Sequence, residues 1–327
     1  MPSKRNINHY KSGNWFGKPY LFFGDYLKYK FNTSLYKLPI NANLSCPNRD
    51  GTIGTSGCIY CSEDGSASPT SYGLSHITKQ MDNAKNSLRR RDAKTKYIAY
   101  FQAYTNTYAS TAELKELYDI AIAFEDVIGM MIATRPDCLT EEVIDLIADY
   151  KRDNFELWLE IGMQSMHEKS LRLLQRGHLH TATRDSIFRA SQRGIPVCAH
   201  IIIGIPDESW DEIMETAREI SSMPVRGIKF HHLHVIKGTS LEKYYLDGKI
   251  KTITFNEYIS TICDFIERLR PDIIIHRLLG DRDEATLVAP LWGLHKGTVI
   301  KAIEDEFIRR GSYQGLLYED NNLFGID

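Results

Sequence analysis

The chain has 327 residues, which suits one barrel-sized domain with extensions rather than a minimal domain. Hydrophobic residues make up 43% and charged residues 25%, as in a typical globular protein, and the net charge of -2 excludes a globally basic surface. No apolar run approaches the ~20 residues of a transmembrane helix. The basic N-terminus has no apolar segment behind it, which excludes a secretory signal. We therefore expect a cytoplasmic protein with no membrane partner, in a compartment that keeps thiols reduced.

The first segment, residues 1–33, is rich in aromatic side chains: Tyr10, Trp15, Phe16, Tyr20, Phe22, Phe23, Tyr26, Tyr29 and Phe31. One interpretation is a cap that packs on a larger domain. The other is a nucleic-acid platform, because aromatic rings interleaved with Lys and Arg can stack bases. The sequence leaves both interpretations open.

A loop dense in Gly, Thr and Asn follows the first expected strand, residues 35–40, and holds three of the six cysteines: Cys46, Cys58 and Cys61. Thiolates are soft ligands that select zinc, copper(I) or iron–sulfur clusters. A structural zinc site needs four ligands, and a fully ligated cubane cluster needs four cysteines. The next candidate ligand, His76, lies fifteen residues further on. Three cysteines on a cubane would leave one iron open to a substrate, and a zinc knuckle is the alternative.

A repeating β–α pattern follows the cysteine loop. A helix is expected over residues 77–94, and five further strands over residues 96–101, 127–133, 155–161, 197–203 and 227–235. Capping residues mark the helices between them: capping boxes begin at Ser110 and Ser209, and Thr140 is a further cap. Six strands alternating with helices imply parallel β–α units with right-handed crossovers. The pattern alone does not separate an open doubly wound sheet from a barrel.

The β–α pattern ends near residue 240. Residues 256–269 and 298–310 predict helices, and Ile273–His276 predicts a short strand. We interpret residues 240–327 as a C-terminal extension that packs against the main domain and helps to close its open side. The scattered cysteines are expected to be buried as small hydrophobic side chains: Cys138, Cys198 and Cys263.

The segment from Asn43 to Cys61 resembles the cluster loop of radical S-adenosylmethionine (SAM) enzymes, above all in Cys58-Ile59-Tyr60-Cys61 with its aromatic residue before the last cysteine. Eleven residues separate the first two cysteines, as in the elongator-type branch. The sequence of this segment is similar to that of the bacterial YhcC/YtqA-like family, whose YtqA branch is also called MnmL. The resemblance implies an α/β fold, a radical-SAM partial (β/α)6 TIM-like barrel. Residues 34–239 would form this core, between an N-terminal extension (1–33) and a C-terminal extension (240–327).

The same resemblance implies the cofactors. Cys46, Cys58 and Cys61 would hold a [4Fe-4S] cluster, and SAM would bind its open iron and be cleaved to methionine and a 5′-deoxyadenosyl radical. A reducing partner of the flavodoxin or ferredoxin type would supply the electron. In barrel folds the active site lies at the C-terminal ends of the strands, and the cysteine loop follows the first strand at that end.

Residues that follow the expected strands are the candidates for SAM contacts. Where the superfamily usually carries Gly-Gly-Glu for the SAM amino group, this chain offers oxygen acceptors without a carboxylate. The structural alternative for Asn106 is a turn, and for Arg135 an ion pair with Asp137. Gln164 and Ser165 would lie near the ribose or methionine end, and Gly204 beside adenine. The full cofactor-binding set is Tyr60, Gln102, Thr105, Asn106, Arg135, Gln164, Ser165, Arg176, Ile203 and Gly204.

Four residues are candidates for catalysis: Glu160, His232, His234 and Lys237. Glu160 lies near the end of the fourth strand, where burying an unpaired carboxylate without a function would be costly. Alternation along the sixth strand places His232 and His234 on one face and His231 on the other. A lone histidine is usually structural, but three histidines followed by Lys237 indicate substrate contacts.

The MnmL-like relatives act on the wobble uridine of tRNA and convert its carboxymethylaminomethyl group toward aminomethyl. The resemblance therefore implies a tRNA substrate, whose phosphates could bind the basic run Arg89–Arg91 with Lys94 and Lys96; the structural alternative is a solvated face. Two other interpretations stay open. One is radical chemistry on a small metabolite or another RNA position, and the other is a zinc-stabilised RNA-binding module without enzyme activity.

Overall fold

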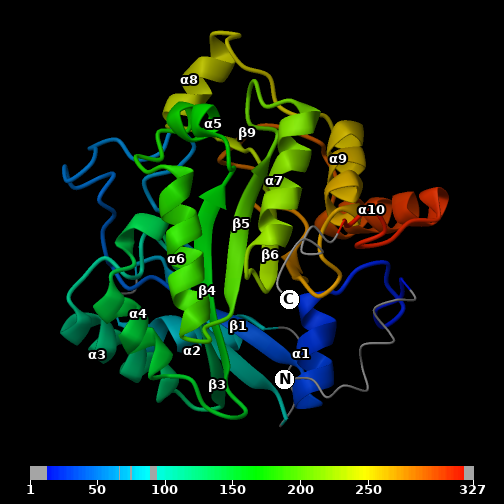
Figure 1. Ribbon diagram of the computed structural model, residues 1–327. Coiled ribbons are helices and arrows are strands. Elements are labelled where there is room, and N and C mark those ends of the chain that lie inside the picture. Colours follow the sequence, from blue (N-terminus) through cyan, green and yellow to red (C-terminus); the bar gives the residue numbers. More distant parts are fainter. Residues whose placement is uncertain (1–12, 66, 74–75, 89–93, 320–327) are drawn as a thin grey trace, which may run out of the picture.

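The computed structural model describes residues 13–65, 67–73, 76–88 and 94–319 and shows a half-barrel of strands covered by helices (Figure 1). Seven parallel strands form one sheet in the order β1-β2-β3-β4-β5-β6-β8. Their bounds are β1 (Leu35–Ile40), β2 (Lys96–Phe101), β3 (Val127–Thr134), β4 (Glu156–Gln164), β5 (Val197–Ile203), β6 (Gly227–His232) and β8 (Ile274–Arg277). The predicted α/β partial barrel is confirmed.

The seventh strand, β8, is the short strand predicted at Ile273–His276. It pairs in parallel with β6, with Gly227 opposite Ile274. Its apolar run Ile273–Ile275 is almost fully buried, as expected for a parallel strand that is covered on both faces. A strand that the sequence assigned to the C-terminal extension therefore completes the sheet, while the domain boundaries at 33/34 and 239/240 stay predictions.

Helices cover the outer face of the sheet: α2 (Ile77–Ser87), α3 (Thr111–Ile122), α4 (Glu141–Ala148), α6 (His180–Gln192), α7 (Trp210–Ser222) and α9 (Phe255–Glu267) (Figure 1). The capping prediction at Ser209 is confirmed, since Ser209 and Glu212 make both bonds of the capping box. Further elements are α5 (Glu168–Leu173), α8 (Ser240–Leu246), α10 (Lys296–Arg310) and an antiparallel pair of β7 (Val235–Ile236) with β9 (Leu287–Ala289). The basic run Arg89–Arg91 lies outside the described residues.

Helix α1 (Phe23–Phe31) covers the inner face of the sheet at the end where the strands begin (Figure 1). Phe23 and Leu27 pack against Trp158 and other side chains of this face, and α1 contacts both edge strands, β1 and β8. Just before the helix, the Leu21 carbonyl accepts a hydrogen bond from the Ile275 amide at 2.8 Å. The N-terminal segment therefore closes the gap between the edge strands at this end.

Burial of the N-terminal rings favours the cap over the nucleic-acid platform. Trp15, Tyr20 and Phe23 are at most 4% exposed, so their faces cannot stack on bases. Phe16 and Tyr29 are more than half exposed. Tyr10 lies outside the described residues. Among the described helices, none is both long enough and apolar enough to cross a bilayer.

Candidate active site

The cysteine loop leaves the C-terminal end of β1 and is held by its own backbone. The amides of Arg49 and Asp50 donate to the Cys46 carbonyl at 2.8 and 3.2 Å, and the Cys61 amide donates to the Cys58 carbonyl at 3.0 Å. Nη2 of Arg49 donates to the Cys61 carbonyl at 2.9 Å. All three cysteines are free thiols, so all three remain available as metal ligands.

A buried guanidinium lies against the second cysteine of the loop. Nη1 of Arg176 donates to Cys58 Sγ at 3.3 Å and to the Tyr60 hydroxyl at 3.2 Å. Asn48 Nδ2 donates to the same sulfur at 3.5 Å. Burial by itself raises the pKa of the Cys58 thiol, but the charges of Arg176 and Arg135 outweigh burial and lower it. The site thus favours the thiolate, which is the form that binds metal.

Strand β4 ends in an irregular segment that depends on glycine. Nη2 of Arg176 donates to the Gly162 carbonyl at 2.9 Å, and a Cβ added at Gly162 would lie 3.0 Å from this Nη2 and 2.8 Å from Gln164 Nε2. Only glycine allows both side chains to approach so closely. Gln164 is buried, has a φ of +67° and lies at a register shift in the pairing with β5. Positive φ at a non-glycine residue costs free energy and is concentrated at functional sites.

Ser165, which the sequence assigned to the SAM site, is hydrogen-bonded to a carboxylate from the loop after β5. Its Oγ donates to Glu208 Oε1 at 2.5 Å, and Ser170 Oγ donates to the same oxygen at 2.7 Å. Burial raises the pKa of Glu208. The sequence analysis did not assign a role to Glu208, whose contacts link the loops after β4 and β5.

Asn106 and Arg135, near the strand ends, each have a buried polar atom without a partner in the described structure. Asn106 donates from Nδ2 to the Ala133 carbonyl at 2.9 Å, but its Oδ1 accepts no hydrogen bond. Arg135 forms a bidentate pair with Asp137 at 3.0 and 2.8 Å and donates to the Arg176 carbonyl, yet its Nη1 is unpaired. An unpaired acceptor and an unpaired donor suit the ammonium and the carboxylate of an amino-acid moiety such as that of SAM. The residues present therefore fit the predicted cofactor.

The remaining predicted cofactor residues lie at the same strand ends. Thr105 is buried and follows β2, and the Gln102 amide donates to the Ile40 carbonyl at 3.1 Å, between the ends of β1 and β2. Ile203 is the last residue of β5, and its carbonyl accepts from the Leu233 amide at 2.9 Å. Gly204 has a φ of +84°, and a Cβ there would lie 2.9 Å from Ile253.

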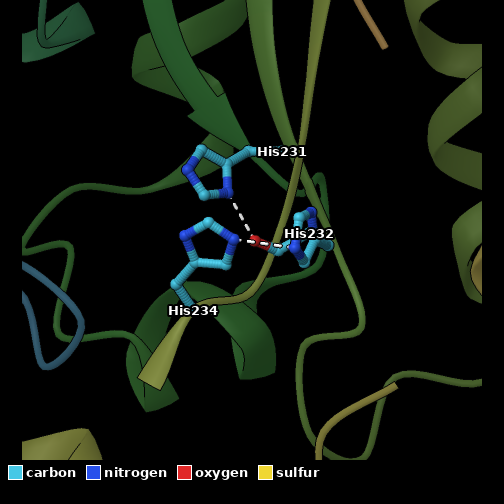
Figure 2. A group of neighbouring side chains, drawn as sticks. All are labelled: His231, His232 and His234. Atoms are coloured by element: carbon cyan, nitrogen blue, oxygen red, sulfur yellow. Dashed lines mark hydrogen bonds between the residues drawn. The ribbon is translucent and has the colours of Figure 1, made fainter. Parts of the chain in front are cut away.

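Three histidine rings meet at the end of β6 (Figure 2). The prediction that His232 and His234 lie together agrees with the contact between them, but His231 is not set apart from this pair: the strand ends at His232, and the rings of His231 and His234 lie 4.4 Å apart. Nε2 of His232 and Nε2 of His234 share a hydrogen bond of 2.7 Å, and His232 also stacks on Trp292 at 4.3 Å. Burial, reinforced by Arg277, lowers the pKa of His234 to about 3.

The histidine cluster can bind polar groups only as neutral rings. Burial lowers the pKa of His232 to about 2 and that of His231 well below its usual value. One nitrogen from each ring lies within 4.8 Å of the others, which is compatible with a metal. However, Nδ1 of His231 already bonds the His232 carbonyl. Lys237 does not join the cluster: it is exposed and donates to the Ala285 carbonyl at 2.7 Å.

Glu160 lies in the middle of β4 rather than at its end, because the strand extends to Gln164. Its Oε2 accepts hydrogen bonds from Tyr100 at 2.8 Å and from Lys229 at 2.7 Å. Sequence analysis missed Lys229, although a lysine at an alternate position of the apolar strand β6 was a usable signal. The carboxylate of Glu160 is therefore paired, with partners from two other strands. It faces the inside of the half-barrel, as Tyr100 does.

The C-terminal segment reaches back to the cysteine loop. Nη2 of Arg282 donates to Ser62 Oγ at 2.9 Å and to Asp64 Oδ2 at 3.3 Å. Ser62 directly follows Cys61 in the chain, and Asp64 lies two residues further on. Residues 278–289 therefore lie next to the site at the C-terminal end of the sheet.

Two family models match the chain: the Radical SAM superfamily over residues 49–220 and the Radical SAM C-terminal domain over residues 225–309. YtqA of Bacillus subtilis (strain 168) is 37% identical over 92% of this chain and 94% of its own length. YhcC of Escherichia coli (strain K12) is 36% identical over 90% and 93%. The solved structure of archaeal Elp3 from Methanocaldococcus infernus, lacking residues 1–46, has a TM-score of 0.64 at 16% identity. The match covers 86% of this chain and 64% of that chain, and it shows a likeness of fold alone.

Proposed function

We propose, from the premise that this chain belongs to the radical SAM superfamily and within it to the family of YtqA and YhcC, that Cys46, Cys58 and Cys61 hold a [4Fe-4S] cluster and that SAM is its second cofactor. The observation that carries this proposal is the set of three free thiols in one loop, with the Arg176 guanidinium 3.3 Å from one of them. Bound together, the two cofactors would supply a carbon radical that abstracts hydrogen from a substrate.

The protein's own residues bind and orient these groups. Arg176 stabilises the negative charge of the Cys58 sulfur, and Arg49 fixes the backbone by donating to the carbonyls of Cys61 and Ser62. Asn106 Oδ1 offers an acceptor to the SAM ammonium, and Arg135 Nη1 offers a donor to its carboxylate. Burial of these atoms keeps water away and strengthens each charged contact.

We propose further that the substrate is the wobble uridine of tRNA, with the carboxymethylaminomethyl group converted toward aminomethyl. Support comes from the resemblance to the MnmL branch and from the 37% identity with YtqA over nearly the whole length of both chains. The overall charge of -2 provides no general attraction for RNA, so local basic side chains must bind the phosphates. If they do, the affinity for tRNA falls steeply as salt is raised.

The test is anaerobic reconstitution with iron and sulfide, followed by dithionite and SAM, with 5′-deoxyadenosine as the readout. We expect iron and acid-labile sulfide in the wild type, and 5′-deoxyadenosine that increases with undermodified tRNA. Cys58→Ala should lose both cluster and product, whereas Cys263→Ala, in the buried core away from the loop, should keep them. A colourless protein that holds zinc and does not cleave SAM would contradict the proposal.

A further inference from the structure

The inner face of the half-barrel carries a closed triangle of polar side chains from three strands. Lys229 Nζ lies 2.7 Å from Glu160 Oε2 and 2.6 Å from the Tyr100 hydroxyl, which in turn donates to Glu160 Oε2 at 2.8 Å. The three residues are buried. In this arrangement Oε2 of Glu160 accepts two hydrogen bonds, whereas Oε1 of Glu160 accepts none.

Cations around Glu160 outnumber anions. Lys37 Nζ lies 3.6 Å from Glu160 Oε1, too far for a good hydrogen bond, and the charge of Arg277 acts on the neighbouring Lys229. Burial lowers the pKa of Lys229 to about 7 in spite of Glu160, and the charges of Lys37 and Arg277 act in the same direction as burial. Lys37 and Arg277 therefore both lie close enough for their positive charges to act on Lys229.

Two histidines complete this face in neutral form. Burial lowers the pKa of His200 and of His276 well below the usual value, with nearby lysines acting in the same direction. Nε2 of His200 has no hydrogen-bond partner. The side chains of Lys37, His200 and Arg277 are partly exposed although they lie on the inner face. These three side chains are therefore in contact with solvent.

A metal ion does not suit this face, although Glu160, Cys198 and His276 each offer a ligand atom within 4.8 Å of the others. The His276 ring is stacked on Phe23 at 3.9 Å, and its Nε2 points at the backbone of Gly227, where an added Cβ would lie only 2.6 Å away. The nearby lysines would also repel a divalent cation.

We propose that this inner face is a subsite for an amino-acid-like zwitterionic group of the substrate, with its ammonium at Glu160 Oε1 and its carboxylate at Lys37 and Arg277. A lone anion would leave the buried Oε1 unpaired, and a lone cation would be repelled by Lys37 and Arg277. A zwitterion meets both conditions, because its ammonium pairs with Oε1 and its carboxylate balances the charges of Lys37 and Arg277. The identity of the group rests on the proposed function, because the carboxymethylaminomethyl unit is an N-substituted glycine with an ammonium two bonds from its carboxyl carbon.

The test measures anaerobic binding of three free nucleosides to the reconstituted enzyme by calorimetry. 5-Carboxymethylaminomethyluridine is the zwitterion, 5-aminomethyluridine carries only the cation, and 5-carboxymethyluridine carries only the anion. We expect the zwitterion to bind ~10-fold or more tightly than either, since a charged hydrogen bond is involved at each end. Lys37→Met should weaken the two carboxylate-bearing nucleosides ~10-fold and leave 5-aminomethyluridine unchanged or tighter.

Two variants keep this test selective. Lys30→Met is the matched control, because Lys30 pairs with Glu156 at 2.6 Å at the start of the same strand, and it should change none of the three affinities. Glu160→Gln should remove the preference for the zwitterion over 5-carboxymethyluridine, and its melting temperature reports whether the fold survives. Equal affinities for the three nucleosides, no binding of the zwitterion at millimolar concentration, or equal effects of Lys37→Met and Lys30→Met would overturn the subsite.

Failure of the subsite is distinguishable from failure of the proposed function. If tRNA stimulates formation of 5′-deoxyadenosine while Lys37→Met changes the affinities of the three nucleosides equally or not at all, the function stands and the subsite falls. If the nucleosides rank as expected while tRNA gives no stimulation, the subsite stands and the tRNA assignment falls.

Discussion

Arg176 offers the sharpest test of how the protein would tune the potential of the proposed cluster. Its guanidinium is buried, donates to Cys58 Sγ at 3.3 Å and is further held by the Tyr60 hydroxyl and the Gly162 carbonyl. A unit charge 4 Å away contributes ~4 kcal/mol at an effective dielectric constant of 20. An electron added to the cluster is spread over several atoms, so we take half of this value, ~2 kcal/mol. For one electron that is ~90 mV.

Arg176→Met should therefore lower the midpoint potential of the cluster by ~90 mV, because the lost positive charge stabilised the reduced state. The assay is a redox titration followed by electron paramagnetic resonance on protein with verified iron content. Arg176→Lys keeps the charge and should shift the potential by much less. An unchanged potential in Arg176→Met with a full cluster would refute the reasoning, since the charge would then not act on the cluster.

Three further predictions follow from packing and from linkage. Gly162→Ala places a methyl 3.0 Å from Arg176 Nη2, so we expect a loss of ~1–3 kcal/mol in thermal denaturation and weaker SAM binding; an unchanged melting temperature would contradict the close contact. Phe23→Ala should cost ~3–5 kcal/mol of unfolding free energy, against less than ~0.5 for the exposed Phe16→Ala; similar losses would argue against the cap. Because the pKa of Lys229 is about 7 when folded and near 10.5 when unfolded, the unfolded state binds more protons between these values. Wild-type stability should then rise with pH from 7 to 10 relative to Lys229→Met, by at most ~1.4 kcal/mol per pH unit in urea titrations; a constant difference would show that this lysine is not desolvated.

Local signals predicted most of the architecture. Alternating apolar strands and capping residues such as Ser209 are determined within a few residues, and the cysteine loop can be read directly from its spacing. The contact between His232 and His234 agrees with the predicted alternation, but the contact of His231 with His234 could not be predicted, because alternation holds only while a strand continues and β6 ends at His232.

Contacts between distant segments could not be predicted from the sequence. Arg176 meets Cys58 across 118 positions of the chain, and Lys229 meets Tyr100 across 129. Each of these contacts depends on strand order and register, which a single sequence does not encode locally. The same holds for β8, whose length and composition predicted a strand but not its place beside β6.

Helix α1 has a consequence for how molecules enter and leave. Because it closes the inner face where the strands begin, the half-barrel is covered at that end, and its other end lies beside the cysteine loop. A group that binds between Lys37 and Glu160 would then have to enter from the end of the sheet that carries the cysteine loop, so access to the inner face and access to the three cysteines would share one entrance.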